Sequence, residues 1–311
     1  MLPLVVILGP TATGKTKIGV ELALRLNGEV ISGDSMQVYR YMDIGTAKIT
    51  PAETKGVPHH LLDIKNPDEP FSVAEFQKEA RTRIADIVSR GKLPFLVGGT
   101  GLYLQSVIDR YVFAEQDNVQ EYRLELLALA DKHGKTYLHQ LLAEVDPPAA
   151  AKIHPNDLKR ITRALEYYRL TGQRISDNKE ARYSSLYQVV LIGLTMRREL
   201  LYQRIEQRVD AMMANGFLEE VKALLARGFT ADLPAMQGLG YKQLVAYLQG
   251  ACDLAEAIQL IKKETRHFAK RQLTWFRRDP RIQWFNAEEA EYNYEEIISQ
   301  MIRLIGRTIQ H

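Results

Sequence analysis

Residues 4–16 read Leu4-Val5-Val6-Ile7-Leu8-Gly9-Pro10-Thr11-Ala12-Thr13-Gly14-Lys15-Thr16, and this stretch decides how the chain folds. It begins as a short apolar run, turns at Gly9, and then follows the pattern Gly-x-x-x-x-Gly-Lys-Thr before an amphipathic segment at residues 18–26. A strand, a glycine-rich loop and a helix in this order are the setting that a phosphate-binding loop requires. The sequence therefore predicts such a loop at the start of an α/β fold.

The chemistry of the predicted loop comes from its backbone and from two side chains. Glycines reach dihedral angles that other residues avoid, successive amides point at phosphate oxygens, and the start of the helix adds partial positive charge. Lys15 is expected to neutralise a phosphate, and the Thr16 hydroxyl to hold Mg²⁺. A glycine-rich turn that binds nothing is disfavoured, because the whole motif and both flanking segments agree. All eight loop positions are candidate binding residues: Gly9, Pro10, Thr11, Ala12, Thr13, Gly14, Lys15 and Thr16.

Strand and helix patterns alternate through the first part of the chain. Apolar runs at residues 28–34, 59–64 and 94–97 predict strands, and residues 73–90 predict a helix that begins with a capping box at Ser72 and Glu75. This alternation is typical of a doubly wound parallel sheet.

After residue 114 the pattern becomes helical until a β-rich run at residues 187–195 returns the chain to the sheet. We therefore expect a P-loop doubly wound parallel sheet core with an all-helical insertion domain. The core comprises residues 1–115 and 186–311, and the insertion residues 116–185. The remaining predicted elements are helices at 122–132, 137–145, from a cap at Asn156 to Thr171, 197–214, 217–227, 253–276 and 289–305, and a strand at 281–285.

Composition bounds the class of protein. The chain has 311 residues, of which 46% are hydrophobic and 25% charged, enough to bury a full core. No apolar stretch approaches the roughly 20 residues of a membrane span, and residues 1–8 lack the features of a signal peptide. We expect a cytoplasmic monomer with no membrane partner. The single cysteine, Cys252, is expected to be an inert thiol.

Basic residues concentrate in two segments. Residues 261–281 carry a net charge of +6 in a chain whose total is +3, and their charges alternate with His267, Phe268, Trp275 and Phe276. The helix that follows Asn156 presents a second basic face. Such asymmetry suggests a polyanionic partner, although a merely solvated basic face explains the second segment almost as well.

Polar residues follow several predicted strands at the edge where a parallel sheet binds ligands. Asp34 ends the second strand, beside the phosphate loop, and is followed by Ser35-Met36-Gln37-Val38-Tyr39, which suits a recognition loop. Thr100 follows the fourth strand. Asp34 is a candidate magnesium ligand or proton acceptor. Asp63 competes for the metal role, whereas His59 and His60 alternate in and out of a strand and are not expected to be ligands.

Three functions are compatible with these residues. The leading one is an enzyme that activates a phosphorylated small molecule beside a bound nucleic acid. A small-molecule kinase that binds ATP, with the insertion as its lid, is the alternative. A non-catalytic, nucleotide-switched nucleic-acid-binding protein is a third.

The motifs also resemble those of a known family, the bacterial tRNA dimethylallyltransferases, also called isopentenyl-pyrophosphate:tRNA transferases. The resemblance rests on the phosphate loop and on four further blocks: Ser32-Gly33-Asp34-Ser35-Met36-Gln37-Val38-Tyr39, Asp43-Ile44-Gly45-Thr46-Ala47-Lys48, Gly98-Gly99-Thr100-Gly101-Leu102-Tyr103 and Ala269-Lys270-Arg271-Gln272-Leu273-Thr274-Trp275-Phe276. It implies transfer of a dimethylallyl group from dimethylallyl diphosphate to N6 of the adenosine beside the anticodon, with Mg²⁺ assisting.

The resemblance also implies roles for particular residues. Asp34 would orient the amine and take its proton, Lys15 and Arg208 would stabilise the departing diphosphate, and Thr100 would place a hydroxyl near the bridging oxygen. An anticodon stem-loop of tRNA is the expected partner, because a base is most easily unstacked in a single-stranded loop. The residues expected to bind it are Asp34, Ser35, Met36, Gln37, Thr100, Arg123, Lys159, Arg160, Arg163, Lys270, Arg271, Trp275 and Arg277.

Overall fold

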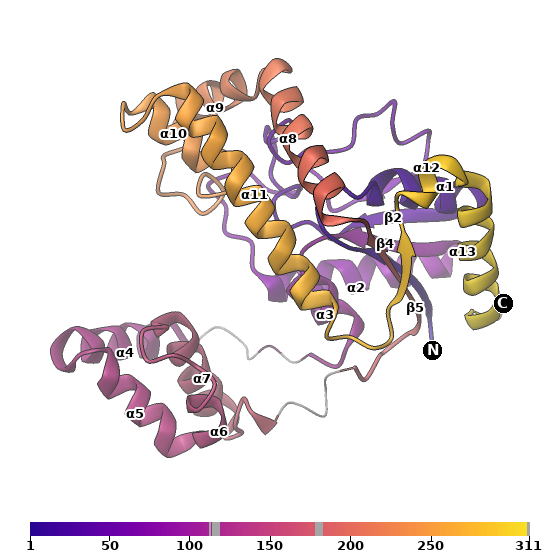
Figure 1. The fold of residues 1–311 in the computed structure, drawn as a ribbon. Helices are drawn as coiled ribbons and strands as arrows, with labels where there is room; N and C mark the ends of the chain where they lie inside the picture. The colour runs from indigo at the N-terminus through magenta and orange to yellow at the C-terminus, as the bar shows by residue number, and fades with distance from the viewer. Residues whose placement is uncertain (112, 114–118, 178–182, 310–311) are drawn as a thin grey trace. The chain divides into compact units, whose positions relative to one another are not determined.

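The chain forms two compact units (Figure 1). The first combines Met1–Ile108 with Ser185–His311, and the second is Asp109–Ser184. The structure, a computed structural model, describes residues 1–111, 113, 119–177 and 183–309. The predicted domain boundary at residues 115 and 116 lies outside the described residues.

The first unit is built on a parallel sheet of six strands, which confirms the predicted α/β fold class. Strand β1 lies between β4 and β5, and Val5 is in register with both Phe95 and Val190. Along the sheet the order is β3-β2-β4-β1-β5-β6, so most neighbouring strands are not consecutive in the chain. The strands are β1 (Pro3–Leu8), β2 (Gly28–Ser32), β3 (His59–His60), β4 (Leu93–Gly98), β5 (Gln188–Thr195) and β6 (Gln283–Asn286).

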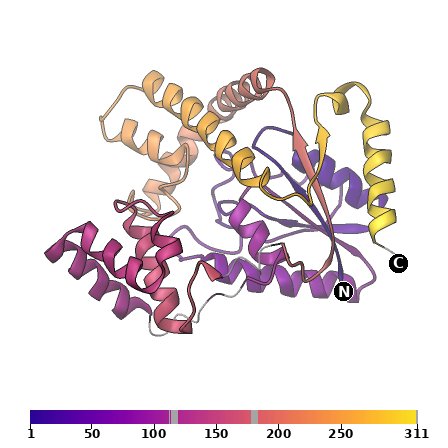
Figure 2. The same ribbon diagram turned by 60° about the horizontal axis from the view of Figure 1, so that its bottom comes forward.

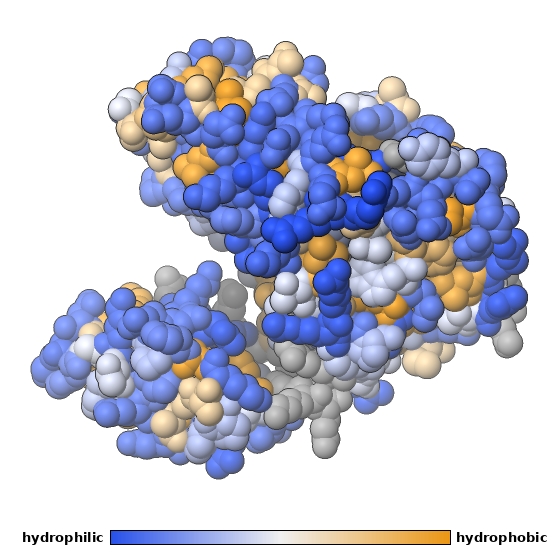
Figure 3. Space-filling model, in the orientation of Figure 1, coloured by the Kyte–Doolittle hydropathy of each residue, from blue (hydrophilic) through white to orange (hydrophobic). Residues whose placement is uncertain are grey.

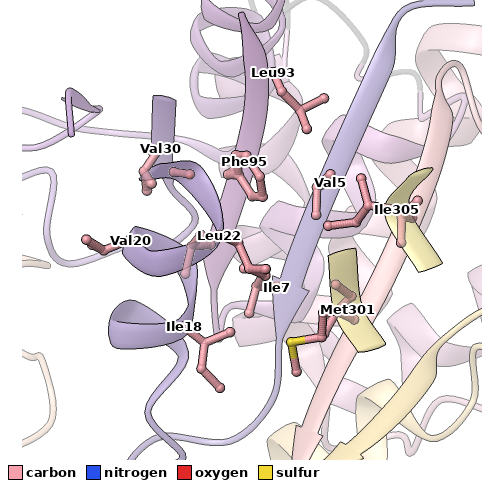
Figure 4. Close-up of a cluster of buried hydrophobic side chains, with 14 of the residues drawn as sticks. Val5, Ile7, Ile18, Val20, Leu22, Val30, Leu93, Phe95, Met301 and Ile305 are labelled. Carbon is pink, nitrogen blue, oxygen red and sulfur yellow. The ribbon is translucent and has the colours of Figure 1, made fainter. Parts of the chain in front are cut away.

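Helices cover both faces of this sheet. Alternate residues of each strand point to opposite faces. Val5 and Ile7 meet α1 (Lys15–Arg25) and α13 (Tyr294–Thr308) in the cluster that Figure 4 shows, where Leu22 and Met301 approach the sheet. Residues of β1 on the other face pack against α2 (Val73–Ser89) and α3 (Gly101–Ile108). Helix α2 begins with the predicted capping box, in which Ser72 and Glu75 bond each other's backbone amides.

Four further helices of the first unit form a group of their own, salmon to orange in Figure 2. They are α8 (Arg198–Ala214), α9 (Phe217–Ala226), α10 (Tyr241–Leu248) and α11 (Leu254–Phe276). Their shared core includes Val38, Tyr39 and Met42 from the loop that follows β2. This packing fixes the loop that begins at Asp34, because three of its side chains are buried among the helices.

In the described residues of the second unit, which are 109–111, 113, 119–177 and 183–184, the regular elements are all helices, joined by turns and loops. Its longer helices α4 (Val119–His133), α5 (Lys135–Val145) and α7 (Leu158–Thr171) enclose an apolar core that includes Leu138, Leu142 and Ile161, and the short α6 (Pro147–Ala150) closes one side. Helix α7 is capped by Asp157, whose carboxylate accepts the Arg160 N–H, so the predicted cap at Asn156 was wrong by one residue.

Several predicted elements differ in extent. The strand expected at residues 59–64 is only two residues long, because Leu61 and Asp63 have φ angles of +62° and +55°. The strand expected to end at Asp34 stops at Ser32. The helix expected at 289–305 is two helices, α12 (Glu289–Tyr292) and α13, interrupted at Asn293. None of the helices in the described ranges is long and apolar enough to cross a membrane.

Candidate functional site

Three turns of the first unit meet at the carboxyl edge of the sheet, because β2, β4 and β1 are neighbours there. The turns hold Asp34, Thr100 and the phosphate loop respectively. Between β2 and β4 the backbones are nearly in contact: a Cβ on Gly98 would lie 2.3 Å from the Gly33 carbonyl oxygen. The Ser35 N–H also donates to the Thr100 hydroxyl over 3.3 Å. Glycines thus allow the two polar turns to approach each other.

The phosphate loop has the conformation that its sequence predicts. Gly9 has φ +144°, and a Cβ there would lie 2.5 Å from the Leu194 carbonyl oxygen of β5, so only glycine fits. Gly14, with φ +81°, precedes α1 and provides no side-chain cap. The first amides of α1 are therefore left for an anion. Lys15 extends over the loop and donates from Nζ to the Pro10 carbonyl, 2.7 Å away.

Two cations and one carboxylate set the electrostatics of this edge. Burial, followed by repulsion from Arg208, lowers the pKa of Lys15 to about 7, while Asp34 acts in the opposite direction. Burial also lowers the pKa of Arg208, against the attraction of Asp34 and Glu53. The positive charges of Lys15 and Arg208 therefore repel each other, and the negative charge of Asp34 offsets this repulsion only in part. A bound anion such as diphosphate would relieve their repulsion.

The recognition loop after β2 is held by hydrogen bonds to its own backbone and side chains. Asp34 accepts the Met36 N–H at Oδ1 over 2.8 Å, which orients the carboxylate. Gln37 accepts the Ser32 hydroxyl over 2.9 Å and donates to the Thr46 carbonyl, 3.2 Å away. Asp34, Ser35, Met36, Gln37 and Thr100 are all half-buried, so each keeps an exposed surface beside the phosphate loop.

Two charged residues that the sequence did not single out fix the far part of that loop. Glu220 of α9 accepts the backbone N–H groups of Asp43, Ile44 and Gly45 over 2.9, 2.7 and 3.1 Å. Lys48, only 6% exposed, bonds Asp43 and Asp63, each over 2.6 Å. Asp63 is therefore an ion-pair partner of a buried lysine, which accounts for its carboxylate without a metal.

Gln272 of α11 joins two of the three turns. It is 6% exposed, and its Oε1 accepts the Thr11 N–H over 2.9 Å. Its Nε2 donates to the Gly99 carbonyl, also 2.9 Å away. The sequence offered one signal, a glutamine among the apolar positions of α11, but the partners lie 261 and 173 residues away in the chain.

The site fits a magnesium ion that is held mostly by its substrate. Among the residues that the structure describes, no three His, Cys, Asp or Glu side chains gather to hold a metal. Mg²⁺ in phosphate-binding sites takes one or two protein ligands and completes its shell with phosphate oxygens and water. Thr16 stands exposed at the start of α1, where such a ligand is needed.

The basic face of α11 is partly neutralised by its own fold. Lys262 pairs with Asp210 and Arg266 with Glu206 of α8, each over 2.6 Å. The predicted tRNA-binding residues of this segment, Lys270, Arg271, Trp275 and Arg277, are exposed. In Figure 3 hydrophilic side chains dominate the surface over α8 and α11. The charge available to a polyanion is therefore smaller than the +6 of the sequence.

In the second unit the predicted tRNA-binding residues fall into two groups. Lys159 and Arg160 are exposed, and Arg160 lies 3.9 Å from its neighbour Asp157. Arg123 instead donates two hydrogen bonds, of 2.5 and 2.8 Å, to the carboxylate of the fully buried Glu166, and Arg163 lies 3.9 Å from the same carboxylate. Arg123 thus has a structural partner that the sequence did not reveal.

The fold and the site define an α/β protein whose phosphate loop shares the carboxyl edge of its sheet with an aspartate and a threonine. The family model described as IPP transferase matches residues 37–279. The chain belongs to the IPP transferase family.

Relatives support this assignment over nearly the whole chain. The tRNA dimethylallyltransferase of Carboxydothermus hydrogenoformans is 56% identical over 301 residues, which are 96% of each chain. That of Heliobacterium modesticaldum is 56% identical over 92% of this chain and 90% of its own.

Solved structures agree with the sequence relatives. A crystal structure of the tRNA isopentenylpyrophosphate transferase of Bacillus halodurans has a TM-score of 0.75 at 49% identity, covering 99% of this chain and 98% of the other. A eukaryotic dimethylallyltransferase, captured acting on tRNA, has a TM-score of 0.85 at 32% identity, covering 97% of this chain and 78% of the other.

Proposed function

We propose that this chain transfers a dimethylallyl group from dimethylallyl diphosphate to N6 of the adenosine beside the anticodon of tRNA and releases diphosphate. The observation that carries the proposal is the junction of phosphate loop, Asp34 and Thr100 at one sheet edge, in a chain whose relatives at 56% identity are named tRNA dimethylallyltransferases.

The reaction forms a C–N bond and breaks an allylic C–O bond. An exocyclic adenine amine is a weak nucleophile, so the enzyme must stabilise the leaving diphosphate and accept a proton from nitrogen. Lys15, the loop amides and Arg208 supply positive charge for the diphosphate, the electrostatic contribution that usually dominates such catalysis. Asp34, whose carboxylate is oriented by the Met36 N–H, accepts the proton.

The Thr100 hydroxyl accepts a hydrogen bond from the Ser35 N–H and keeps its own proton for donation. That proton can stabilise the bridging oxygen as the C–O bond breaks. Thr16 would hold Mg²⁺ beside the diphosphate, and the bound ion would supply further positive charge for the leaving group.

We further propose that the tRNA is held through its anticodon stem-loop by the exposed residues of α11 and by Lys159, Arg160 and the partly exposed Arg163 of the second unit. The exposure of these cations and of Trp275 supports this proposal. The cytoplasmic location and the monomeric state stay predictions.

The alternative, a small-molecule kinase, would bind ATP at the same loop. The relatives are named for dimethylallyl transfer to tRNA, which favours the transferase. Incubation with tRNA, Mg²⁺ and either dimethylallyl diphosphate or ATP, followed by mass analysis of the nucleosides, tests the choice directly. We expect a prenylated adenosine in the incubation with dimethylallyl diphosphate and none in the incubation with ATP. ATP-dependent phosphorylation of a small molecule would contradict the proposal.

A further inference from the structure

Gln272 occupies an unusual place for a buried amide. It extends from α11 between the phosphate loop and the Gly98–Gly101 turn, and both ends of its side-chain amide are used. The acceptor end takes the Thr11 N–H and the donor end reaches the Gly99 carbonyl, each over 2.9 Å. A side chain with one acceptor and one donor is what these two partners require.

The turn is shaped around this amide. A Cβ on Gly99 would lie 2.4 Å from Gln272 Nε2, so no larger residue fits while Gln272 is in place. One turn of α11 later, Trp275 packs on Gly101, where a Cβ would lie 2.3 Å from the indole. The helix therefore contacts the turn on both sides of Thr100.

The consequence is a chain of contacts through the site. Gln272 fixes Thr11 in the phosphate loop, and it fixes Gly99 next to Thr100, whose hydroxyl accepts the Ser35 N–H. Because the Thr11 N–H donates its hydrogen bond to Gln272, the orientation of the loop's remaining amides depends on a residue of α11. Small displacements of such groups are costly for a reaction that relies on preorganised charge.

We propose that Gln272 is a positioning residue that sets the phosphate loop and Thr100 in their mutual arrangement for the allyl diphosphate. The reaction named in this inference rests on the proposed function, whereas the contacts of Gln272 do not depend on it. The side chain acts through the loop and the turn, so the variants should weaken diphosphate binding and slow the chemical step while tRNA binding is unchanged.

The first test compares Gln272→Met with the matched control Gln188→Met. Gln188 also joins distant segments, since it donates to the Thr308 carbonyl over 2.5 Å, but it lies at the amino end of β5. For Gln272→Met we expect kcat/KM for dimethylallyl diphosphate to fall roughly 10- to 100-fold, because misplaced groups lose preorganisation. Inorganic diphosphate should bind more weakly, and KM for tRNA should stay near wild type. The control should keep kcat/KM within about twofold.

The second test uses Gln272→Glu, which has nearly the same shape. Its carboxylate can still accept the Thr11 N–H but repels the Gly99 carbonyl, whereas the protonated acid can make both bonds. The ratio of its kcat/KM to that of wild type should rise as the pH falls from about 8 to about 6. The ratio is used because Lys15, whose pKa is about 7, titrates in both proteins.

Two results would overturn the inference. One is a folded Gln272→Met protein with wild-type diphosphate affinity and kcat. The other is equal loss of activity in both methionine variants, in proportion to their lost thermal stability, together with a Gln272→Glu ratio that does not change with pH. If wild type itself prenylates no tRNA, the proposed function fails, and the affinities for inorganic diphosphate still decide the role of Gln272.

Discussion

Asp34 is the residue on which the proposed chemistry depends most directly. Asp34→Asn keeps an oxygen that can accept the Met36 N–H, 2.8 Å away, so the loop should keep its conformation. The amide cannot accept a proton, and we expect kcat to fall by about 10²- to 10⁴-fold. Affinity for tRNA should change only a few fold, because that affinity comes mainly from phosphate contacts. Single-turnover kinetics and a binding titration separate the two effects.

Asp63→Asn is the control for the aspartate. Asp63 bonds the buried Lys48, so its loss should lower thermal stability rather than the rate of the chemical step. A near-normal kcat for Asp34→Asn would remove Asp34 as the proton acceptor. A large loss for Asp63→Asn in a fully folded protein would restore Asp63 as a candidate site residue.

Lys15 predicts a pH dependence of diphosphate binding. Burial and the charge of Arg208 lower its pKa to about 7. A bound anion favours the charged form and raises this pKa, so binding takes up a proton above pH 7. Affinity should therefore be highest below about pH 7 and fall by at most about tenfold per pH unit above it. Calorimetric titration with dimethylallyl diphosphate at several pH values measures the slope.

The variant Lys15→Met isolates this contribution. It keeps an unbranched side chain without the charge, so binding should be weaker and the extra fall above pH 7 should disappear. The ionisation of the ligand itself is the same in both titrations. Identical slopes for wild type and variant would show that Lys15 does not take up the proton.

At the scale of elements, α9 holds the recognition loop through one carboxylate. Glu220 accepts three backbone N–H groups and the Tyr241 hydroxyl, the last over 2.6 Å. Glu220→Ala leaves these donors unpaired, and we expect the free energy of unfolding to fall by about 2–3 kcal/mol. Because the same loop begins at Asp34, kcat should also fall. Denaturant unfolding and steady-state kinetics measure the two.

The adjacent residue, Glu219, provides the control for Glu220. Glu219 is largely exposed and pairs with Lys222 one turn along the same helix, so Glu219→Ala should cost about 0.5 kcal/mol or less. Equal losses of stability in the two variants would mean that the loop anchor contributes little beyond an ordinary surface ion pair.

The elements that the sequence predicted well are those whose signals are local. The phosphate loop, the capping box of α2 and the apolar runs of β1, β4 and β5 depend on neighbouring residues, and the structure has them all. The shortness of β3 depends on the positive φ angles of Leu61 and Asp63, which no periodicity reveals. The break between α12 and α13 likewise falls at Asn293, inside a continuous amphipathic pattern.

The site was predicted only as far as strand ends could predict it. Asp34, Thr100 and the loop follow three neighbouring strands, so the general rule for parallel sheets brought them together. Gln272 and Glu220 were missed because the backbone groups that they bond lie more than 170 residues away in the chain. Lys48 was missed although its partners are near in sequence, because only the folded loop brings Asp43 and Asp63 together around it. The sequence also could not show that Lys262 and Arg266 form ion pairs with Asp210 and Glu206 of α8, because these partners are more than 50 residues away in the chain.

At the scale of the whole molecule, each unit has its own balance of free and paired cations. In the second unit Arg123 and Arg163 both approach Glu166, which is fully buried. Arg123→Ala would leave that carboxylate with Arg163 at 3.9 Å, and we expect a loss of up to about 3 kcal/mol in the free energy of unfolding. Thermal unfolding of the variant checks this expectation. An unchanged midpoint would show that Glu166 has other compensation.

The charges proposed for tRNA call for a different measurement, the salt dependence of binding. Arg160 is 62% exposed at its side chain and Arg163 39%, and each lies 3.9 Å from a carboxylate of its own helix. The Arg160–Asp157 pair is exposed on both sides and weak, worth roughly 0.3–0.5 kcal/mol, so a phosphate can compete for the Arg160 guanidinium. A phosphate can also compete for Arg163, because the buried Glu166 keeps Arg123 as its closer partner. Replacing both arginines with alanine should then weaken tRNA binding and lower the salt slope by a little under one unit for each lost contact.

The same double variant should keep its kcat with a saturating minimal stem-loop, because neither arginine belongs to the unit that holds Asp34 and the phosphate loop. Titration of wild type and variant with a fluorescent anticodon stem-loop at several salt concentrations gives both the affinity and the slope. Lys222→Ala, at an exposed ion pair on α9, is the charge control and should change neither. Parallel salt plots with equal affinities would instead mean that Arg160 and Arg163 serve only Asp157 and Glu166. In that case the tRNA contacts would have to come from α11, where Lys270 and Arg271 remain exposed.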